Sequence, residues 1–136
     1  MAAHLFPTLV RGGDQPDLTL VTYGGMLPVV EAVAAHLEEE EELSVEILVP
    51  SLLSPVSKNG LIGHLLERSS VVMVEESHHD FGVSAEIGAS LLDNEYQGRF
   101  LRIGTPPVPI ASARSLERQI LPDEASLIEQ ILDWIQ

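Results

Sequence analysis

The chain has 136 residues, and its 21 acidic and seven lysine or arginine side chains give a formal net charge of −14. This length suits one globular domain with a single core, and no apolar run approaches the roughly 20 residues that cross a bilayer. Such an acidic chain lacks the basic stripe that binds a nucleic-acid backbone or an anionic membrane, so neither is expected as a partner. Its electric field favours cations or a basic protein surface.

The sequence contains no cysteine, which excludes a disulfide, a thiol nucleophile and a cysteine-ligated metal. Its first residues, 1–7, lack the basic and apolar regions of a signal peptide. We therefore expect a cytoplasmic protein.

The first half of the chain begins with a weakly patterned segment, residues 1–16, in which residues 9–10 could form a short strand. Alternating and β-forming residues predict a strand over 17–23. An apolar stripe at helical spacing then predicts a helix that begins at Met26. Because the run of glutamates 38–42 opposes the helix dipole, we expect that helix to fray or end early there.

The middle of the chain continues the alternation of strands and helices. Strands are predicted over 44–49, 70–75 and 99–103, and the uniform apolarity of 70–75 is typical of burial on both faces of a parallel sheet. Between them, the spacing of apolar residues predicts a modest helix over 57–69, weakened by two glycines, and a small-residue helix over 82–92.

The last element is a helix that begins near Pro122 and Asp123, two residue types typical of a helix N-terminus. Alternation from residue 17 to the end predicts an α/β domain with a parallel sheet and helices on both faces. In such sheets ligands bind outside the carboxyl ends of the strands. There, Gly24 and Gly25 are interpreted as a sharp turn, because no phosphate-binding glycine motif surrounds them.

The loop after the third long strand collects two glutamates, two histidines and an aspartate, a composition that could bind a metal or transfer protons. However, His78 and His79 are adjacent and point in different directions, and the H-x-x-x-H spacing is absent. His4, His36 and His64 are interpreted as surface or helix-face residues. No serine lies in a G-x-S-x-G motif. We predict no catalytic, cofactor-binding or metal-binding residue in the chain.

Six segments follow one another in an order that can be compared with known families. They are 17–26 (DLTLVTYGGM), 45–55 (VEILVPSLLSP), 71–76 (VVMVEE), 82–89 (GVSAEIGA), 107–109 (PVP), and 116–117 (LE) with 121–122 (LP). This order resembles the C-terminal domain of transketolase-like thiamine-diphosphate enzymes. It is most similar to the beta subunit of the decarboxylase component of pyruvate or branched-chain 2-oxoacid dehydrogenases. The resemblance covers about residues 8–136.

The resemblance implies a three-layer α/β/α fold with a five-stranded, mostly parallel sheet. Its first strand, near residues 8–11, would be an antiparallel edge strand. The domain proper would span 17–136, after an N-terminal segment 1–16. Two segments depart from the family pattern: 48–55 lacks an expected acid and arginine, and 77–82 has a single glycine.

The resemblance also implies a function without catalysis. Thiamine diphosphate and Mg²⁺ would be held by other domains or subunits of the parent enzyme. This domain would form a homodimer, contact the catalytic domains or the alpha subunit, and dock a basic subunit-binding domain of the acyltransferase core. The loop containing Ser77, His78, His79 and Asp80 is predicted to contact a subunit. The residues predicted to dock the partner are Asp93, Glu95 and Trp134.

Two other functions remain open on the sequence. The chain could be the equivalent domain of a transketolase or of a 1-deoxyxylulose-5-phosphate synthase. It could also be a free-standing regulatory module that binds a ligand at the edge of the sheet.

Overall fold

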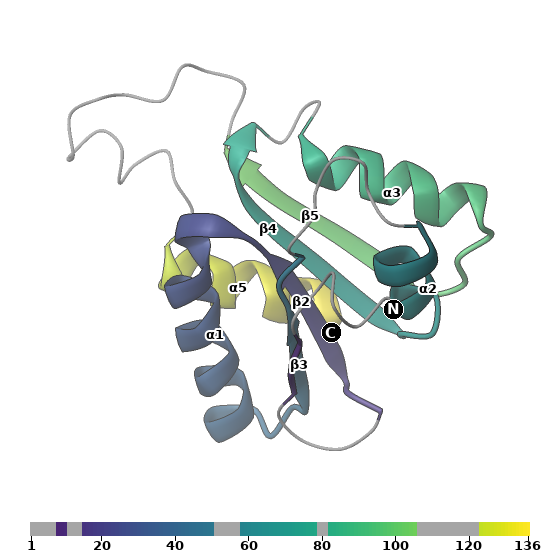
Figure 1. The fold of residues 1–136 in the computed structure, drawn as a ribbon. Coiled ribbons are helices and arrows are strands. Elements are labelled where there is room, and N and C mark those ends of the chain that lie inside the picture. Colours follow the sequence, from purple (N-terminus) through teal and green to yellow (C-terminus); the bar gives the residue numbers. More distant parts are fainter. Residues whose placement is uncertain (1–7, 11–14, 51–57, 79–81, 106–122) are drawn as a thin grey trace.

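A computed structural model describes residues 8–10, 15–50, 58–78, 82–105 and 123–136 (Figure 1). The strands are β1 (Thr8–Val10), β2 (Leu18–Thr22), β3 (Val45–Leu48), β4 (Ser70–His78) and β5 (Arg99–Thr105). The helices are α1 (Leu27–Glu40), α2 (Gly63–Leu65), α3 (Val83–Asp93) and α5 (Glu124–Ile135), with a 3₁₀ turn η2 (Gly24–Met26) and a π-helix η3 (Lys58–Ile62).

The five strands form one sheet in the order β1-β3-β2-β4-β5. The four strands from β2 to β5 are mutually parallel, which confirms the predicted α/β class. At one edge, β1 pairs with β3 in the antiparallel sense, with Leu9 opposite Ile47. Central strands are buried on both faces, and Val71, Val72, Met73 and Val74 of β4 are at most 1% exposed. This burial explains their uniformly apolar sequence.

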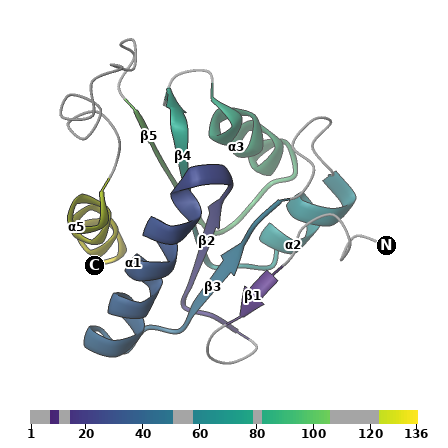
Figure 2. The same ribbon diagram turned by 60° about the vertical axis from the view of Figure 1, so that its left-hand side comes forward.

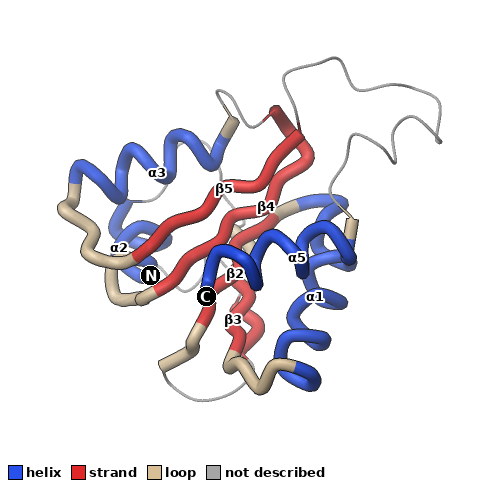
Figure 3. Tube along the Cα trace, turned by 180° about the vertical axis from the view of Figure 1, so that it is seen from behind, coloured by secondary structure: helices blue, strands red, loops and turns tan. Residues whose placement is uncertain are grey.

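Helices cover both faces of the sheet (Figure 2). On one face, Val33 and Leu37 of α1 pack with Leu127 and Ile131 of α5. On the other face, Leu65 of α2 packs with α3 and β4. Figure 3 shows the same layers from behind, with α1 and α5 on one side and α2 and α3 on the other. No described helix has the length and apolarity that a membrane span requires.

The end of α1 falls within the run of glutamates, as predicted. The helix includes three of the five glutamates and ends at Glu40. Glu42 adopts a left-handed conformation (φ 56°), and the Leu43 N–H donates to the Leu37 carbonyl at 3.1 Å. The left-handed Glu42 thus forms the C-terminal cap of the helix, and Leu43 packs against the core just beyond it. The cap and the exposure of the last glutamates offset their unfavourable position in the helix dipole.

The segment 57–69 is not the single helix that was predicted. It contains the π-helix η3 followed by the three-residue α2. The burial of Leu61, Ile62 and Leu65 against the sheet holds this irregular segment in place. Tertiary packing here outweighs the weak local helix propensity of a segment with two glycines.

Helix α5 begins as predicted, with Asp123 as its N-cap residue. The Asp123 carboxylate accepts a hydrogen bond from the Ser126 N–H at 2.8 Å. At the other end, the Arg99 guanidinium lies 4.4 Å from the centroid of the Trp134 ring and donates to the Trp134 carbonyl. The first residue of β5 therefore caps the C-terminus of α5.

Candidate functional site

The topology directs attention to the carboxyl ends of β2 and β4. The chain passes from β2 to its neighbour β3 on one side and then to β4 on the other side, so the direction of winding reverses at β2. Such a switch point is the usual position of ligand sites in open α/β sheets. Here it is bordered by the turn after β2, by the last residues of β4 and by the start of α3 (Figure 1).

Glu75 is the central polar side chain at the switch point, and it is fully buried. Its carboxylate accepts hydrogen bonds from the Ser84 hydroxyl at 2.9 Å and the Ser84 N–H at 3.2 Å. The Tyr23 hydroxyl donates to it at 3.2 Å. Ser84 lies in the first turn of α3, where free N–H groups and the helix dipole stabilise an anion. Glu75 thus fixes α3 to β4 and β2.

The conformation of the turn after β2 requires a glycine at its first position, which agrees with the interpretation of the glycine pair as a sharp turn. Gly24 has a φ of 65°, a conformation that L side chains rarely adopt. A Cβ atom at Gly25 would lie 2.5 Å from Oε1 of the exposed Glu76. Because the exposed Glu76 side chain can move aside, the turn requires glycine at Gly24 rather than at Gly25.

The predicted contact residues lie at separate places. Ser77 and His78 belong to the last part of β4, whereas His79 and Asp80 lie outside the described residues. Asp93 and Glu95 are exposed at the far end of α3. Since α3 has 11 residues, its two ends are about 16 Å apart. The structure thus does not bring Asp93 and Glu95 together with the β4 end.

Trp134 is half-buried rather than freely exposed, because it packs against the core and under Arg99. Its ring is available only in part to a partner. The contact role of Trp134 stays a prediction.

The structure shows a buried charged cluster that the sequence analysis missed. The Glu46 side chain, on β3, is 3% exposed and accepts hydrogen bonds from three side chains. The donors are His64 Nε2 at 2.9 Å, Arg68 Nε at 3.1 Å and the Thr19 hydroxyl at 3.1 Å. His64 lies on α2, in agreement with its interpretation as a surface or helix-face residue, and the structure adds its contact with Glu46 on the neighbouring strand β3.

Two opposing effects act on the Glu46 carboxyl group. Burial by itself raises the pKa, but the hydrogen bonds and positive charges of His64 and Arg68 outweigh it and lower the pKa from 4.5 to about 2. A glutamate within an apolar, buried strand indicates that another side chain must pair with its carboxylate. The identity of that partner follows only from the fold, because His64 is 18 residues further along the chain.

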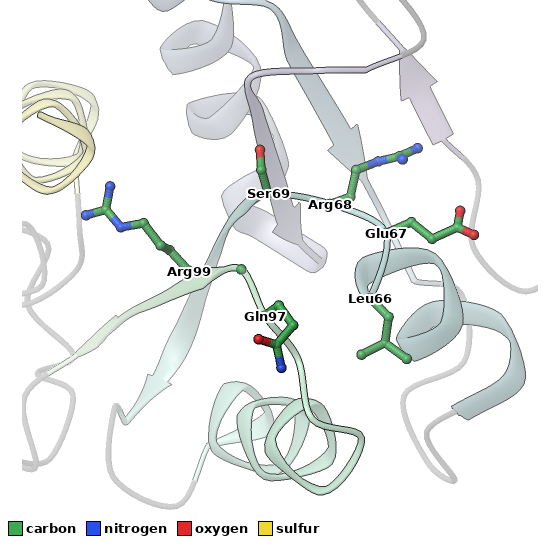
Figure 4. A pocket seen from close by; sticks show the side chains of 7 residues that line it. Leu66, Glu67, Arg68, Ser69, Gln97 and Arg99 are labelled. Atoms are coloured by element: carbon green, nitrogen blue, oxygen red, sulfur yellow. The ribbon is translucent and has the colours of Figure 1, made fainter.

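A shallow hollow of about 340 Å³ lies at the opposite, amino-terminal ends of β4 and β5. It is lined by Leu66, Glu67, Arg68, Ser69, Gln97, Gly98 and Arg99. Figure 4 shows the side chains of Arg68 and Arg99 pointing away from each other. Arg68 binds Glu46, and Arg99 binds the end of α5. Both guanidinium groups are therefore engaged within the fold, which leaves the hollow poorly equipped to hold an anion.

The residues at the switch point do not suit thiamine diphosphate. The carboxylates of Glu75 and Glu76 would repel a diphosphate there. Within the ranges that the structure describes, no three histidine or acidic side chains gather as a metal would require.

The fold is that of a doubly wound α/β domain. Its buried glutamates, Glu46 and Glu75, bind side chains of the same domain and so stabilise the fold. Residues 9–127 match the transketolase C-terminal domain family, and the chain belongs to this family. The match extends from β1 into α5 and confirms the resemblance seen in the sequence.

Two relatives show how the chain compares with longer proteins. It is 30% identical over 115 residues to the pyruvate dehydrogenase E1 component subunit beta-1 of Arabidopsis thaliana, covering 82% of this chain and 31% of that protein. It is 34% identical over 128 residues to the 1-deoxy-D-xylulose-5-phosphate synthase of a Synechococcus strain, covering 92% of this chain and 19% of that protein. The chain thus spans a third or less of these two relatives.

Among solved structures, the chain is similar to a split-gene transketolase described as an inactive beta4 tetramer. The TM-score is 0.73 at 19% identity, and the match covers 94% of this chain and 41% of that one. At this identity the similarity establishes the fold.

Proposed function

We propose that the chain acts as the non-catalytic C-terminal domain of a thiamine-diphosphate-dependent 2-oxoacid dehydrogenase beta subunit. In this role it associates with subunits of the parent enzyme and docks its acyltransferase core. The similarity to a pyruvate dehydrogenase beta subunit over 82% of the chain carries the proposal. Thiamine diphosphate and Mg²⁺ would be bound by the other domains, in a cytoplasmic enzyme.

The distribution of charge supports a docking role. The buried carboxylates of Glu46 and Glu75 have partners inside the fold, so they contribute little attraction at the surface. Exposed acids dominate the helix ends, including Glu39, Glu40 and Asp93. A net charge of −14 increases the encounter rate with a basic subunit-binding domain.

Light scattering on the purified chain tests this proposal directly. The molar mass is measured over a concentration series, alone and with a recombinant subunit-binding domain of a pyruvate dehydrogenase acyltransferase. We expect a dimer that binds the basic domain and releases it as salt rises, because salt screens the exposed charges. A monomer that ignores the basic domain even at low salt would contradict the docking role.

The second candidate is the C-terminal domain of a 1-deoxyxylulose-5-phosphate synthase, favoured by the 34% identity over 92% of the chain. Adding the chain to a synthase that lacks its own C-terminal domain separates the two functions. Restored synthase activity, together with no binding to the acyltransferase domain, would support this alternative.

A further inference from the structure

The outer surface of α3 differs from the rest of the described surface. Leu92 is the large apolar side chain that stands out in solvent among the described residues, with 79% of its surface exposed. The inner side of the same helix buries Ile87 and Leu91 against the sheet. The Leu92 side chain therefore does not contribute to the core beneath α3.

Leu92 continues a line of small apolar residues along the helix. Ala85, Ala89 and Leu92 are four and three residues apart, which places them on one face of an α-helix. This face points away from Ile87 and Leu91. Alanine side chains allow the backbone of a second helix to approach closely, so Leu92 would be the anchor of such a contact.

Acidic side chains border this line on one side. Glu86 and Asp93 are both exposed, and their seven-residue spacing places them together beside Ala85, Ala89 and Leu92. We call these five residues the α3 outer face. An apolar centre with an acidic border fits an amphipathic helix that has lysine or arginine next to its apolar stripe.

The charges argue against two other occupants of the α3 outer face. In a symmetric antiparallel contact between two copies, Glu86 of one copy would face Asp93 of the other, and like charges would repel. An anionic membrane would be repelled by the same two carboxylates. A basic amphipathic helix satisfies both the exposed Leu92 and the acids beside it.

We propose that the α3 outer face is the docking surface for a basic amphipathic helix of the partner. This inference rests on the proposed docking function, for which it names the surface and the chemistry of the ligand. In the complex, an apolar partner side chain covers Leu92, and lysine or arginine side chains pair with Glu86 and Asp93.

The test titrates a fluorescently labelled subunit-binding domain of a pyruvate dehydrogenase acyltransferase with the chain and three variants. Leu92→Gln removes the apolar anchor while retaining a good helix former, and we expect it to weaken binding about tenfold. The double variant E86Q/D93N should weaken binding severalfold and flatten its salt dependence. The matched control E39Q/E40Q removes the same charge from exposed positions on α1 and should change the affinity less than about twofold. Circular dichroism verifies that all variants are folded.

The results separate failure of the surface from failure of the function. Weaker binding by both α3 variants, with the control unchanged, supports the proposal. Wild-type affinity in both α3 variants would overturn the assignment of the surface, while the docking function would stand. Absence of binding by the wild-type chain at low salt would overturn the docking function and this inference with it. Equal weakening by E86Q/D93N and by E39Q/E40Q would show that only net charge matters, which also overturns the surface.

Discussion

The buried carboxylate of Glu46 provides a stringent test of the fold. We predict that Glu46→Gln destabilises the chain, because the substitution keeps the size of the side chain but removes the charge that Arg68 and His64 contact. The guanidinium of Arg68 would then stay near a neutral amide in a poorly solvated place. Removing one partner from a buried ion pair is usually strongly destabilising.

The magnitude follows from the pKa of Glu46. Its fall from 4.5 to about 2 on folding corresponds to about 3 kcal/mol, at about 1.4 kcal/mol for each pH unit. Since the folded state has the lower pKa, this stability is fully present above the unfolded pKa of 4.5. It is lost as the pH falls from there through the folded pKa of about 2.

Urea unfolding followed by circular dichroism at pH 7, 5, 4 and 3 measures the effect. At pH 7, the midpoint of Glu46→Gln should lie on the order of 2 M urea below that of the wild type. The difference in unfolding free energy between the two proteins should shrink as the pH falls below about 4.5, whereas the control Glu67→Gln, at an exposed position, should match the wild type throughout. A difference that is independent of pH would refute the reasoning, as would equal stability of the two proteins at pH 7.

Three further substitutions test local features by the same urea assay. Glu42→Gly should raise the unfolding free energy by about 1 kcal/mol, because glycine adopts the left-handed φ of 56° without strain; a less stable variant would contradict the cap at the end of α1. Asp123→Ala should lower it by about 1 kcal/mol through loss of the hydrogen bond to the Ser126 N–H, and an unchanged midpoint would argue against this N-cap. Arg99→Ala should lower it by about 1–2 kcal/mol and alter the fluorescence of Trp134, the single tryptophan, since the cation–π contact is lost. An unchanged emission spectrum would show that the ring does not sense Arg99.

The strands and the fold class could be predicted because burial leaves a local record in the sequence. Val71 to Val74 are apolar without interruption because both faces of β4 are covered, and this pattern is visible without the structure. The start of α5 was equally accessible, since an N-cap interaction spans only from Asp123 to Ser126.

Features that depend on distant contacts could not be predicted in this way. The run of glutamates indicated roughly where α1 ends, but its last residue, Glu40, depends on the left-handed Glu42 and on the packing of Leu43 against the core. The partners of Glu46 come from the irregular segment that follows β3, where His64 and Arg68 face the strand only after folding. The sequence indicated which residue types could contact a partner. It did not show that α3 separates Asp93 from the end of β4 by its whole length, because that distance depends on the fold.

The central position of β2 has a consequence for how the chain reaches its structure. Neither neighbour of β2 is joined to it by a hairpin: Thr19 binds Glu46 across 27 residues, and Thr22 binds the Val74 carbonyl across 52 residues. Each pairing closes a long loop before it gains stability, so high contact order should make folding slow. Removing side-chain atoms within β2, as in Val21→Ala, should therefore mainly slow folding. If α5 docks after the sheet has formed, Ile131→Ala should mainly accelerate unfolding.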